Sequence, residues 1–427
     1  MPYIQVFEHD RLTTNEDDFG RKLTPIQFEK LCQFNDKNDN LYFTVIRNGI
    51  KFAQYVGVIQ IGNLTIEILP KADKETFTKS EFKFEAKKWQ KVLMKMLAIS
   101  GELELETVSD ASLKKRTNLL DLYFNIYLNE IDKLMRKGLV KKYRHISSNV
   151  KSLKGRLNFA KNIQQNLIHQ ERFFTTHQQY DHAHLLNQIL LKGLLILDIV
   201  ATDSFMRDNI KKLLFFFPDM QEIPITREAF GQIRLTRKTS DYTKAINIAK
   251  MLILNYAPDI TKGDENMLAL LFDMNKLWEK YIYKKLKSKE NEAFKVSYQD
   301  NDLFWENKRI YPDIVIKRCN ETMMPDDAPP EAWETTIIDT KWKLIEANKP
   351  SDDDLKQMYV YNMYWNSPKS ILLYPQYGHA VDSDFGKFHK GKNGLNHCKI
   401  AFVHVLDESG KLNGEIASQI FLKLDGN

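Results

Sequence analysis

Apolar runs interrupted by single polar residues organise the C-terminal part of the chain. The segments 310–316 and 334–344 are mostly apolar and predict two buried strands. The segments 277–286 and 354–365 predict helices before and after these strands, and 371–374 predicts a further strand. Asp264 is the predicted N-cap of the first of these helices. Helix, strands, helix and strand in this order are typical of an α/β domain.

Four polar residues stand out in these apolar surroundings: Glu279, Asp313, Asp339 and Lys341. Asp339 and Lys341 are two positions apart, so on a strand their side chains share one face. Asp313 ends a Tyr-Pro-Asp turn that leads into the other strand. Carboxylates are the ligands that Mg²⁺ or Mn²⁺ prefers. The sequence therefore predicts a metal site at which Lys341 can stabilise charge on a phosphodiester undergoing hydrolysis.

The tripeptide Asp339-Thr-Lys341 is not specific by itself. Each of its residues alone is more often a cap, a turn or an edge residue than a catalytic group. The same pattern occurs at 81–83, 85–87, 306–308 and 354–356, which we interpret as solvated faces. The buried strand and the upstream Pro-Asp are what distinguish residues 339–341.

Together with Gln357 and Tyr361 on the following helix, these residues resemble the PD-(D/E)xK nuclease fold, in its branch with a Q-x-x-x-Y helix. The resemblance implies that Asp313 and Asp339 bind the metal ion and that Glu279 completes or supports its shell. It also implies that Gln357 holds the site or the DNA strand. For Tyr361, packing alone remains an alternative.

The N-terminal segment 41–71 contains three β-rich runs separated by Asn-Gly at 48–49 and Gly-Asn at 62–63. Asn-Gly between alternating apolar residues is a strong hairpin signal. This pattern predicts a three-stranded antiparallel meander that belongs to a small β-barrel-like domain.

Two helices have their ends marked in the sequence. Thr24 is a suitable N-cap, and Pro25 suits the first position of a helix that runs to about Phe34. A long helix over 118–137 is predicted to end at Gly138, a favourable residue just past a helix.

Further motifs extend the resemblance over essentially the whole chain: Tyr-Val-Gly-Val-Ile at 55–59, Ile-Glu-Ile-Leu-Pro-Lys at 66–71, Leu-Lys-Gly-Arg-Leu at 153–157, and Phe-Asp-Met-Asn-Lys-Leu-Trp-Glu at 272–279. They resemble the McrC family, the nuclease subunits of McrBC-type, 5-methylcytosine-specific restriction systems. The resemblance implies a Mg²⁺- or Mn²⁺-dependent DNA endonuclease that acts on double-stranded, methylated DNA.

The resemblance also implies a partner, an McrB-like AAA+ GTPase that forms hexameric rings. The chain has no G-x-x-x-x-G-K-[ST] motif, so GTP is expected on the partner and not on this chain. The N-terminal domain is expected to dock on the ring and stimulate its GTPase, with the turn of Arg47, Asn48 and Gly49 as a candidate contact.

The densest basic stretch, 132–161, carries ten Lys or Arg residues and a single acid, Asp132. Lys151, Lys154 and Arg156 lie in a Ser/Asn/Gly-rich loop that is a candidate for contact with the DNA backbone. A solvated surface, or one that pairs with a partner protein, is an equal alternative. The net charge of +6 is too small to decide.

Length and composition allow two or three soluble domains in 427 residues. No apolar run reaches about 18 residues, so we expect no transmembrane helix, and three separated cysteines favour a reducing cytoplasm.

We predict a β-rich docking domain over 1–115, a mostly helical region over 116–262 and the nuclease domain over 263–427. A non-cleaving adaptor that only activates the partner motor is the alternative function, and a RecB-type repair nuclease is a weaker one.

Overall fold

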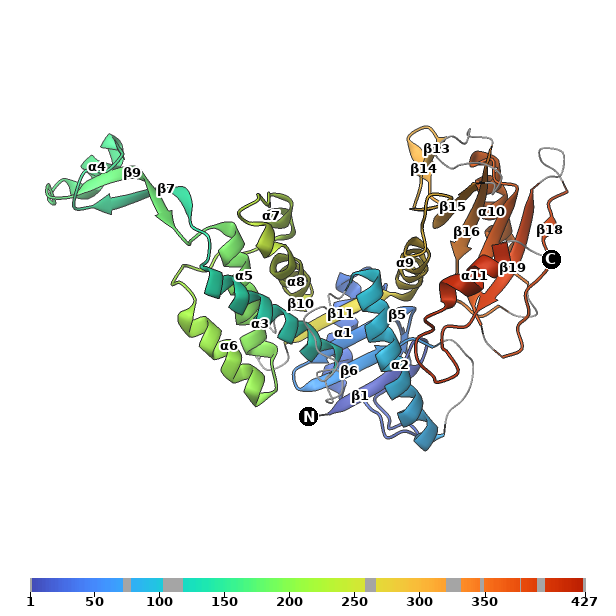
Figure 1. Ribbon diagram of the computed structural model, residues 1–427. Helices are drawn as coiled ribbons and strands as arrows, with labels where there is room; N and C mark the ends of the chain where they lie inside the picture. Colours follow the sequence, from blue (N-terminus) through green and yellow to red (C-terminus); the bar gives the residue numbers. More distant parts are fainter. Residues whose placement is uncertain are drawn as a thin grey trace. The chain divides into compact units, whose positions relative to one another are not determined.

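The computed structural model describes residues 2–71, 78–102, 118–257, 266–319, 332–345, 349–376, 378–389 and 396–424. Figure 1 shows the arrangement of the elements within each part. Two compact units are distinguished: Met1–Pro2, Ile59–Thr65 and Val108–Leu270 form unit 1, and Tyr3–Val58, Ile66–Thr107 and Leu271–Asn427 form unit 2. The three domains predicted over 1–115, 116–262 and 263–427 stay a prediction.

The N-terminal strands form open sheets, so the predicted meander within a small barrel is wrong. Strands β2 (Arg11–Thr13), β4 (Gly49–Phe52) and β3 (Phe43–Ile46) form one sheet in that order. A second sheet has the order β1-β6-β5-β11-β10: Tyr3–Phe7, Leu64–Leu69, Tyr55–Ile61, Met267–Asp273 and Tyr256–Ala257. No sheet of the described residues closes on itself.

Burial explains why the chain changes sheets after residue 52. Nearly every residue of β5 and all residues of β6 are buried, whichever way their side chains point. Such strands need cover on both faces, whereas a meander with one solvated face would alternate. The Asn48-Gly49 turn is present, and Asn48 has a positive φ of 57°. Gly49 is required for a different reason, because a Cβ there would lie 2.5 Å from the carbonyl oxygen of Leu12.

Both helices with marked ends form as predicted. Helix α1 (Pro25–Lys37) starts after Thr24, whose hydroxyl accepts a hydrogen bond from the backbone N–H of Gln27 at 3.2 Å. The Gln27 side chain accepts one from the N–H of Thr24 at 2.9 Å, which completes a capping box. Helix α3 (Leu119–Lys137) ends at Gly138.

Unit 1 contains a helical bundle and a projecting β-arm (Figure 1). The arm consists of a sheet in the order β7-β9-β8 with helix α4 packed on β9. Residues 151–155 form a loop as predicted, whereas Arg156 lies in the short strand β8. The three strands of the arm interrupt the region 116–262, which was predicted to be mostly helical. The elements are α3, β7 (Lys142–Val150), β8 (Arg156–Leu157), α4 (Phe159–Asn166), β9 (Phe173–Asp181), α5 (Leu185–Val200), α6 (Ser204–Phe216), α7 (Arg227–Gly231), a 3₁₀ turn (Ser240–Tyr242) and α8 (Thr243–Leu254).

The C-terminal part of unit 2 is built around a six-stranded sheet with the order β12-β15-β16-β17-β19-β18. Strands β16, β17 and β19 are parallel, and the other pairs are antiparallel. The elements are α9 (Met274–Lys287), β12 (Phe294–Tyr298), β13 (Asp302–Trp305), β14 (Lys308–Ile310), β15 (Ile314–Cys319), β16 (Trp333–Thr340), α10 (Asp352–Tyr364), β17 (Lys369–Pro375), β18 (Gly386–Lys387), β19 (His397–Val403) and α11 (Ile416–Leu424), and α2 (Lys79–Ser100) packs on α9.

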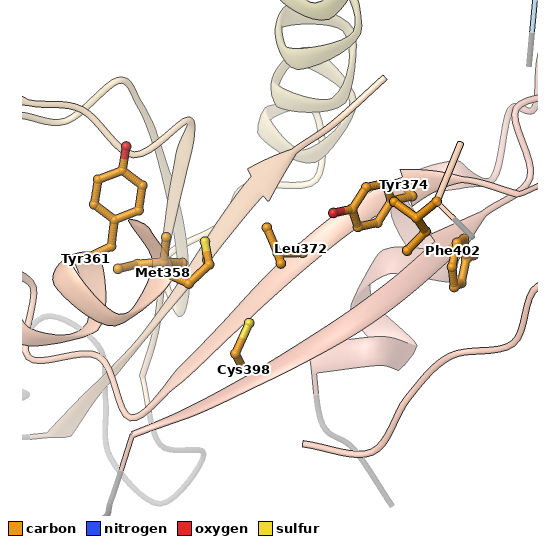
Figure 2. Close-up of a cluster of buried hydrophobic side chains, with 8 residues drawn as sticks. Met358, Tyr361, Leu372, Tyr374, Cys398 and Phe402 are labelled. Atoms are coloured by element: carbon orange, nitrogen blue, oxygen red, sulfur yellow. The ribbon is translucent and has the colours of Figure 1, made fainter. Parts of the chain in front are cut away.

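Helix α10 is fastened to this sheet by a buried apolar cluster. Met358 and Tyr361 of the helix pack with side chains of β17 and β19 (Figure 2). The full set of buried members is Ile337, Ile345, Met358, Tyr361, Leu372, Tyr374, Cys398 and Phe402. Because one face of α10 is fixed in this way, the polar residues beside that face have defined positions.

Three predicted boundaries near the candidate site need correction. The helix that carries Glu279 begins at Met274 with Asp273 as its N-cap, and the predicted cap Asp264 lies outside the described residues. The predicted strand 310–316 is divided by Tyr311-Pro312-Asp313, since a proline inside a ladder removes a donor. The predicted strand 334–344 ends at Thr340. None of the helices in the described ranges is long and apolar enough to cross a membrane.

The close approach of α3 and α5 in unit 1 gives a prediction about stability. The hydroxyl of Tyr127 donates to the carbonyl oxygen of Leu190 at 2.8 Å, and a Cβ on Gly193 would lie 2.2 Å from that hydroxyl oxygen. We expect Gly193→Ala to lower the free energy of unfolding by about 1–3 kcal/mol through overpacking. Denaturant titration measures this, with Gly231→Ala as a control, because a Cβ at Gly231 meets nothing within 4 Å. Equal stability of wild type and Gly193→Ala would contradict the prediction.

Candidate active site

The register of two strands brings two of the predicted acids together. Ile314 of β15 pairs with Ile338 of β16, and continuing the register by one residue sets Asp313 opposite Asp339. Side chains directly opposite in an antiparallel pair lie on the same face and are close. Asp313 and Asp339 therefore meet where β15 begins and β16 ends.

Lys341 lies just beyond the end of β16 and stays close to this pair of acids. Its backbone N–H donates to the carbonyl oxygen of Leu373 at 2.9 Å, so the chain follows β17 for one more residue. Its Nζ is 2.8 Å from Oδ2 of Asp339. The expected grouping of Asp313, Asp339 and Lys341 is thus present in the structure.

Burial and mutual repulsion raise the pKa of both aspartates. The pKa of Asp339, which is 1% exposed, rises to about 7, chiefly through burial and then through the charge of Asp313. The pKa of Asp313 rises to about 6, through burial and then the charge of Glu279, although Thr340 opposes this rise. Thr340 donates from its N–H and its hydroxyl to Oδ2 of Asp313, at 2.7 and 3.0 Å. A cation would relieve this repulsion.

Glu279 reaches the same cluster from helix α9. It is 8% exposed and lies among the buried residues of the helix. Gln299 holds it in place: the Gln299 side chain donates to Oε1 of Glu279 at 2.9 Å, and its backbone N–H donates to the carbonyl oxygen of Asp313 at 3.0 Å. Burial raises the pKa of Glu279, and the charge of Asp339 raises it further. Sequence reasoning did not identify Gln299, because nothing in its local pattern marks a residue that bridges two elements.

The ammonium of Lys341 is surrounded by acceptors. Besides Asp339, it lies 3.5 Å from Oδ1 of Asp354 and donates to Oε1 of Gln357 at 3.1 Å. Burial lowers the pKa of Lys341, but the charges of Asp339, Asp354 and Asp313 outweigh burial and raise it. Lys341 therefore carries its charge at neutral pH.

Asp354 corrects one interpretation of the sequence, which placed 354–356 on a solvated face. It is 7% exposed, and its other oxygen is 2.6 Å from Nζ of Lys343. The N-cap explains the difference, because the hydroxyl of Ser351 accepts from the N–H of Asp354 at 3.2 Å and fixes the first turn of α10. The sequence did offer a signal for this role: Asp354 lies three residues after the N-cap Ser351, in the helix that follows Lys341 and Lys343.

Gln357 and Tyr361 lie on the same face of α10, as predicted from their spacing. Nε2 of Gln357 donates to the hydroxyl of Tyr361 at 2.8 Å, and this hydroxyl donates to the carbonyl oxygen of Tyr311 at 2.7 Å. Tyr361 is part of the apolar cluster (Figure 2), but its hydroxyl also orients Gln357, which in turn contacts Lys341. Packing is therefore only part of the contribution of Tyr361.

The donor set suits a hard divalent cation in its chemistry. Within the described ranges, no three His, Cys, Asp or Glu side chains already form a ligand cage. Asp313 accepts hydrogen bonds from Thr340, and Asp339 forms an ion pair with Lys341. All candidate ligands are nevertheless carboxylate oxygens, which fit Mg²⁺ or Mn²⁺ better than softer metals.

The other predicted residues do not belong to this cluster. Lys151, Lys154 and Arg156 are exposed on the β-arm of unit 1, whereas the carboxylates lie in unit 2. Arg47 and Asn48 are exposed in the turn between β3 and β4, and Gly49 is buried at the start of β4. Their roles in contact with DNA and with a partner stay predictions.

Comparisons with known proteins give a consistent result. The profile of the family described as McrBC 5-methylcytosine restriction system component matches residues 50–375. The chain is 24% identical over 302 residues to the type IV methyl-directed restriction enzyme EcoKMcrBC of Escherichia coli K12, which is 65% of this chain and 83% of that protein. It also resembles a chain in a half-complex of Thermococcus gammatolerans McrB AAA+ hexamers with bound McrC, with a TM-score of 0.66, 19% identity and 99% of each chain covered. At this identity, the structural similarity shows a shared fold.

The hydrogen bonds of Tyr361 can be tested by removing its hydroxyl. We expect Tyr361→Phe to lower the free energy of unfolding by about 1 kcal/mol, because the amide of Gln357 and the carbonyl of Tyr311 lose a partner. Denaturant titration measures the change, and Tyr359→Phe on the same helix is the control. If the two variants are equally stable, the hydroxyl of Tyr361 does not have this role.

Proposed function

Since the chain belongs to the McrBC 5-methylcytosine restriction system component family, we propose that it is the subunit that cuts DNA, a metal-dependent endodeoxyribonuclease. The observation that carries this proposal is the grouping of Asp313, Asp339 and Lys341. The two acids are buried side by side, and the ammonium lies 2.8 Å from one of them. Ligands for a divalent ion and a fixed positive charge are groups that promote hydrolysis of a phosphodiester.

Each side chain has a role that follows from its position. Asp313 and Asp339 would hold Mg²⁺ or Mn²⁺, and Glu279 would complete or support the shell. When bound, the ion would polarise the phosphate and acidify a water molecule. Lys341 orients the attacking water and offsets the negative charge that grows on the phosphate oxygens as the P–O bond to the leaving strand breaks. Gln357 keeps the ammonium in position.

A partner would supply the nucleotide chemistry. One solved relative is an assembly of McrB AAA+ hexamers with bound McrC, and we propose an McrB-like GTPase hexamer as the partner of this chain. In this proposal GTP is bound by the partner, the substrate is methylated double-stranded DNA, and the complex acts in the cytoplasm. The turn at Arg47 and Asn48 is the proposed docking element, and Lys151, Lys154 and Arg156 are proposed contacts to DNA.

The second candidate is an adaptor that activates the motor and does not cut. An adaptor would not need two adjacent acids whose pKa values are raised, first by burial and then by neighbouring carboxylates, to about 6 for Asp313 and about 7 for Asp339. Because these groups are intact and adjacent, we favour the nuclease.

Substitution of the central residues should abolish cleavage. We expect Asp339→Asn or Lys341→Ala to lower the rate of plasmid nicking by at least about 100-fold, in the presence of the partner, GTP and Mg²⁺ or Mn²⁺. Gel analysis of nicked and linear plasmid measures the rate, and circular dichroism verifies that the variants fold.

The chain offers a matched control in Glu306→Gln. Glu306 and Lys308 have the same tripeptide pattern, but they lie exposed at the turn between β13 and β14. This control should cut at the wild-type rate. Wild-type cleavage by Asp339→Asn and Lys341→Ala would leave the adaptor as the remaining candidate.

A second prediction concerns the nucleotide. Phosphate-release assays should detect no GTP hydrolysis by the purified chain and stimulated hydrolysis when it is added to its partner. We expect Arg47→Glu to weaken the stimulation through charge reversal at the proposed docking turn. Lys83→Glu, at another exposed cation on α2, is the control. GTP hydrolysis by the isolated chain would contradict the assignment of the nucleotide to the partner.

A further inference from the structure

A buried carboxyl group from the N-terminal segment lies next to the end of strand β16. Glu8 follows strand β1 and is 1% exposed. Its Oε1 accepts two hydrogen bonds, from Nε1 of Trp342 at 2.6 Å and from the backbone N–H of Lys71 at 2.7 Å. Its Oε2 is buried and makes no hydrogen bond within the described part of the chain, and Nε2 of His9 is 4.0 Å away.

A charged group at this position is costly for the folded protein. Burial raises the pKa of Glu8 to about 7, although the hydrogen bonds from Lys71 and Trp342 oppose the rise, and the charge of Asp273 adds to it. A buried carboxylate with only one oxygen satisfied destabilises the fold. Glu8 therefore contributes to the structure through the groups that it positions, the indole of Trp342 and the backbone of Lys71.

Trp342 connects Glu8 to both sides of the candidate active site. It is the residue directly after Lys341, and its ring packs against Trp278 with the ring centroids 5.2 Å apart. Trp278 in turn directly precedes Glu279 on α9. Trp342 is thus the sequence neighbour of Lys341, and its indole contacts Trp278, the sequence neighbour of Glu279.

The backbone alone does not fix this region. Strand β16 ends at Thr340, and the N–H of Lys341 makes the last hydrogen bond to β17. Residues 341–345 have no regular secondary structure. The orientation of the chain after Lys341 therefore depends on side-chain anchors, of which the buried indole of Trp342 is the largest.

We propose that Glu8 is a positioning residue for the active site, which acts through the hydrogen bond to Trp342 and thereby sets the placement of Lys341 and Glu279. In this view, the N-terminal segment supplies a structural part of the nuclease site as well as any docking surface. The consequence for catalysis rests on the proposed nuclease function, whereas the consequence for the geometry of Lys341 does not.

Two substitutions of Glu8 separate its hydrogen bonds from its charge. Glu8→Gln keeps a carbonyl oxygen that can accept from both Trp342 and Lys71, and its amide nitrogen takes the place of the oxygen that has no hydrogen bond. Glu8→Leu removes both acceptors at similar volume. Trp342→Phe removes the donor and keeps an aromatic ring, so it tests the same hydrogen bond from the other side if Glu8→Leu does not fold.

The first measurement does not depend on activity. The full-length chain is treated with acetic anhydride, and the acetylation rate of Lys341 is followed by peptide mass spectrometry. We expect Glu8→Leu and Trp342→Phe to accelerate acetylation about tenfold, because Lys341 leaves its acceptors, whereas Glu8→Gln should behave as wild type. In the double variant Glu8→Leu/Trp342→Phe, Lys341 should be acetylated no faster than in either single variant, since both substitutions remove the same hydrogen bond.

The second measurement is single-turnover DNA cleavage with the partner, GTP and Mg²⁺. Here Glu8→Leu should slow cleavage about tenfold with unchanged DNA binding, and Glu8→Gln should restore the rate. Glu67→Leu is the matched control, because Glu67 is also buried in the N-terminal segment and accepts hydrogen bonds from Gln5 and Gln90. It should lower the thermal midpoint without changing the acetylation of Lys341.

The outcomes distinguish this inference from the proposed function. Wild-type acetylation of Lys341 in folded Glu8→Leu, or in Trp342→Phe if Glu8→Leu does not fold, would overturn the positioning role. Equal acceleration in Glu67→Leu would also overturn it, since the effect would then be general loosening. If acetylation changes as expected but the wild-type complex does not cut DNA, the nuclease proposal fails and the positioning role stands.

Discussion

Three acidic side chains are buried close enough to raise one another's pKa, and this repulsion shapes the structure around them. Asp339 is opposed by Asp313, Asp313 by Glu279, and Glu279 by Asp339. Such a group of charges is tolerated only when donors or cations surround it. Thr340 and Lys341, at the end of β16, and Gln299, directly after β12, provide these contacts.

The same requirement explains the second layer of contacts around the acids. Lys341 is held by Asp354 and Gln357, and Gln357 is held by the hydroxyl of Tyr361. The apolar cluster beneath α10 fixes that helix on the sheet (Figure 2). A small displacement of α10 would thus move the ammonium of Lys341. Groups that take part in catalysis depend on accurate placement.

Local signals in the sequence were reliable wherever the interaction itself is local. The cap at Thr24, the helix end at Gly138 and the shared face of Gln357 and Tyr361 involve residues within a few positions of each other. The predicted family was confirmed by the match over residues 50–375. The barrel was wrong because hairpin signals report turns but not the sheet that a strand joins. Asp264 was preferred to Asp273 as a cap because the buried strand Met267–Asp273 was not recognised.

The sequence by itself determined the candidate residues Asp313, Asp339, Lys341 and Glu279 and their order along the chain, because buried strands and turns leave a local pattern. Only the tertiary structure decided which residues complete the site. Asp354 looked solvated, Gln299 had no signal, and Glu8 is separated from Trp342 by more than three hundred residues. The physical reason is that the cost of a buried charge is relieved by whichever donor folding brings near, and sequence distance places no limit on that donor.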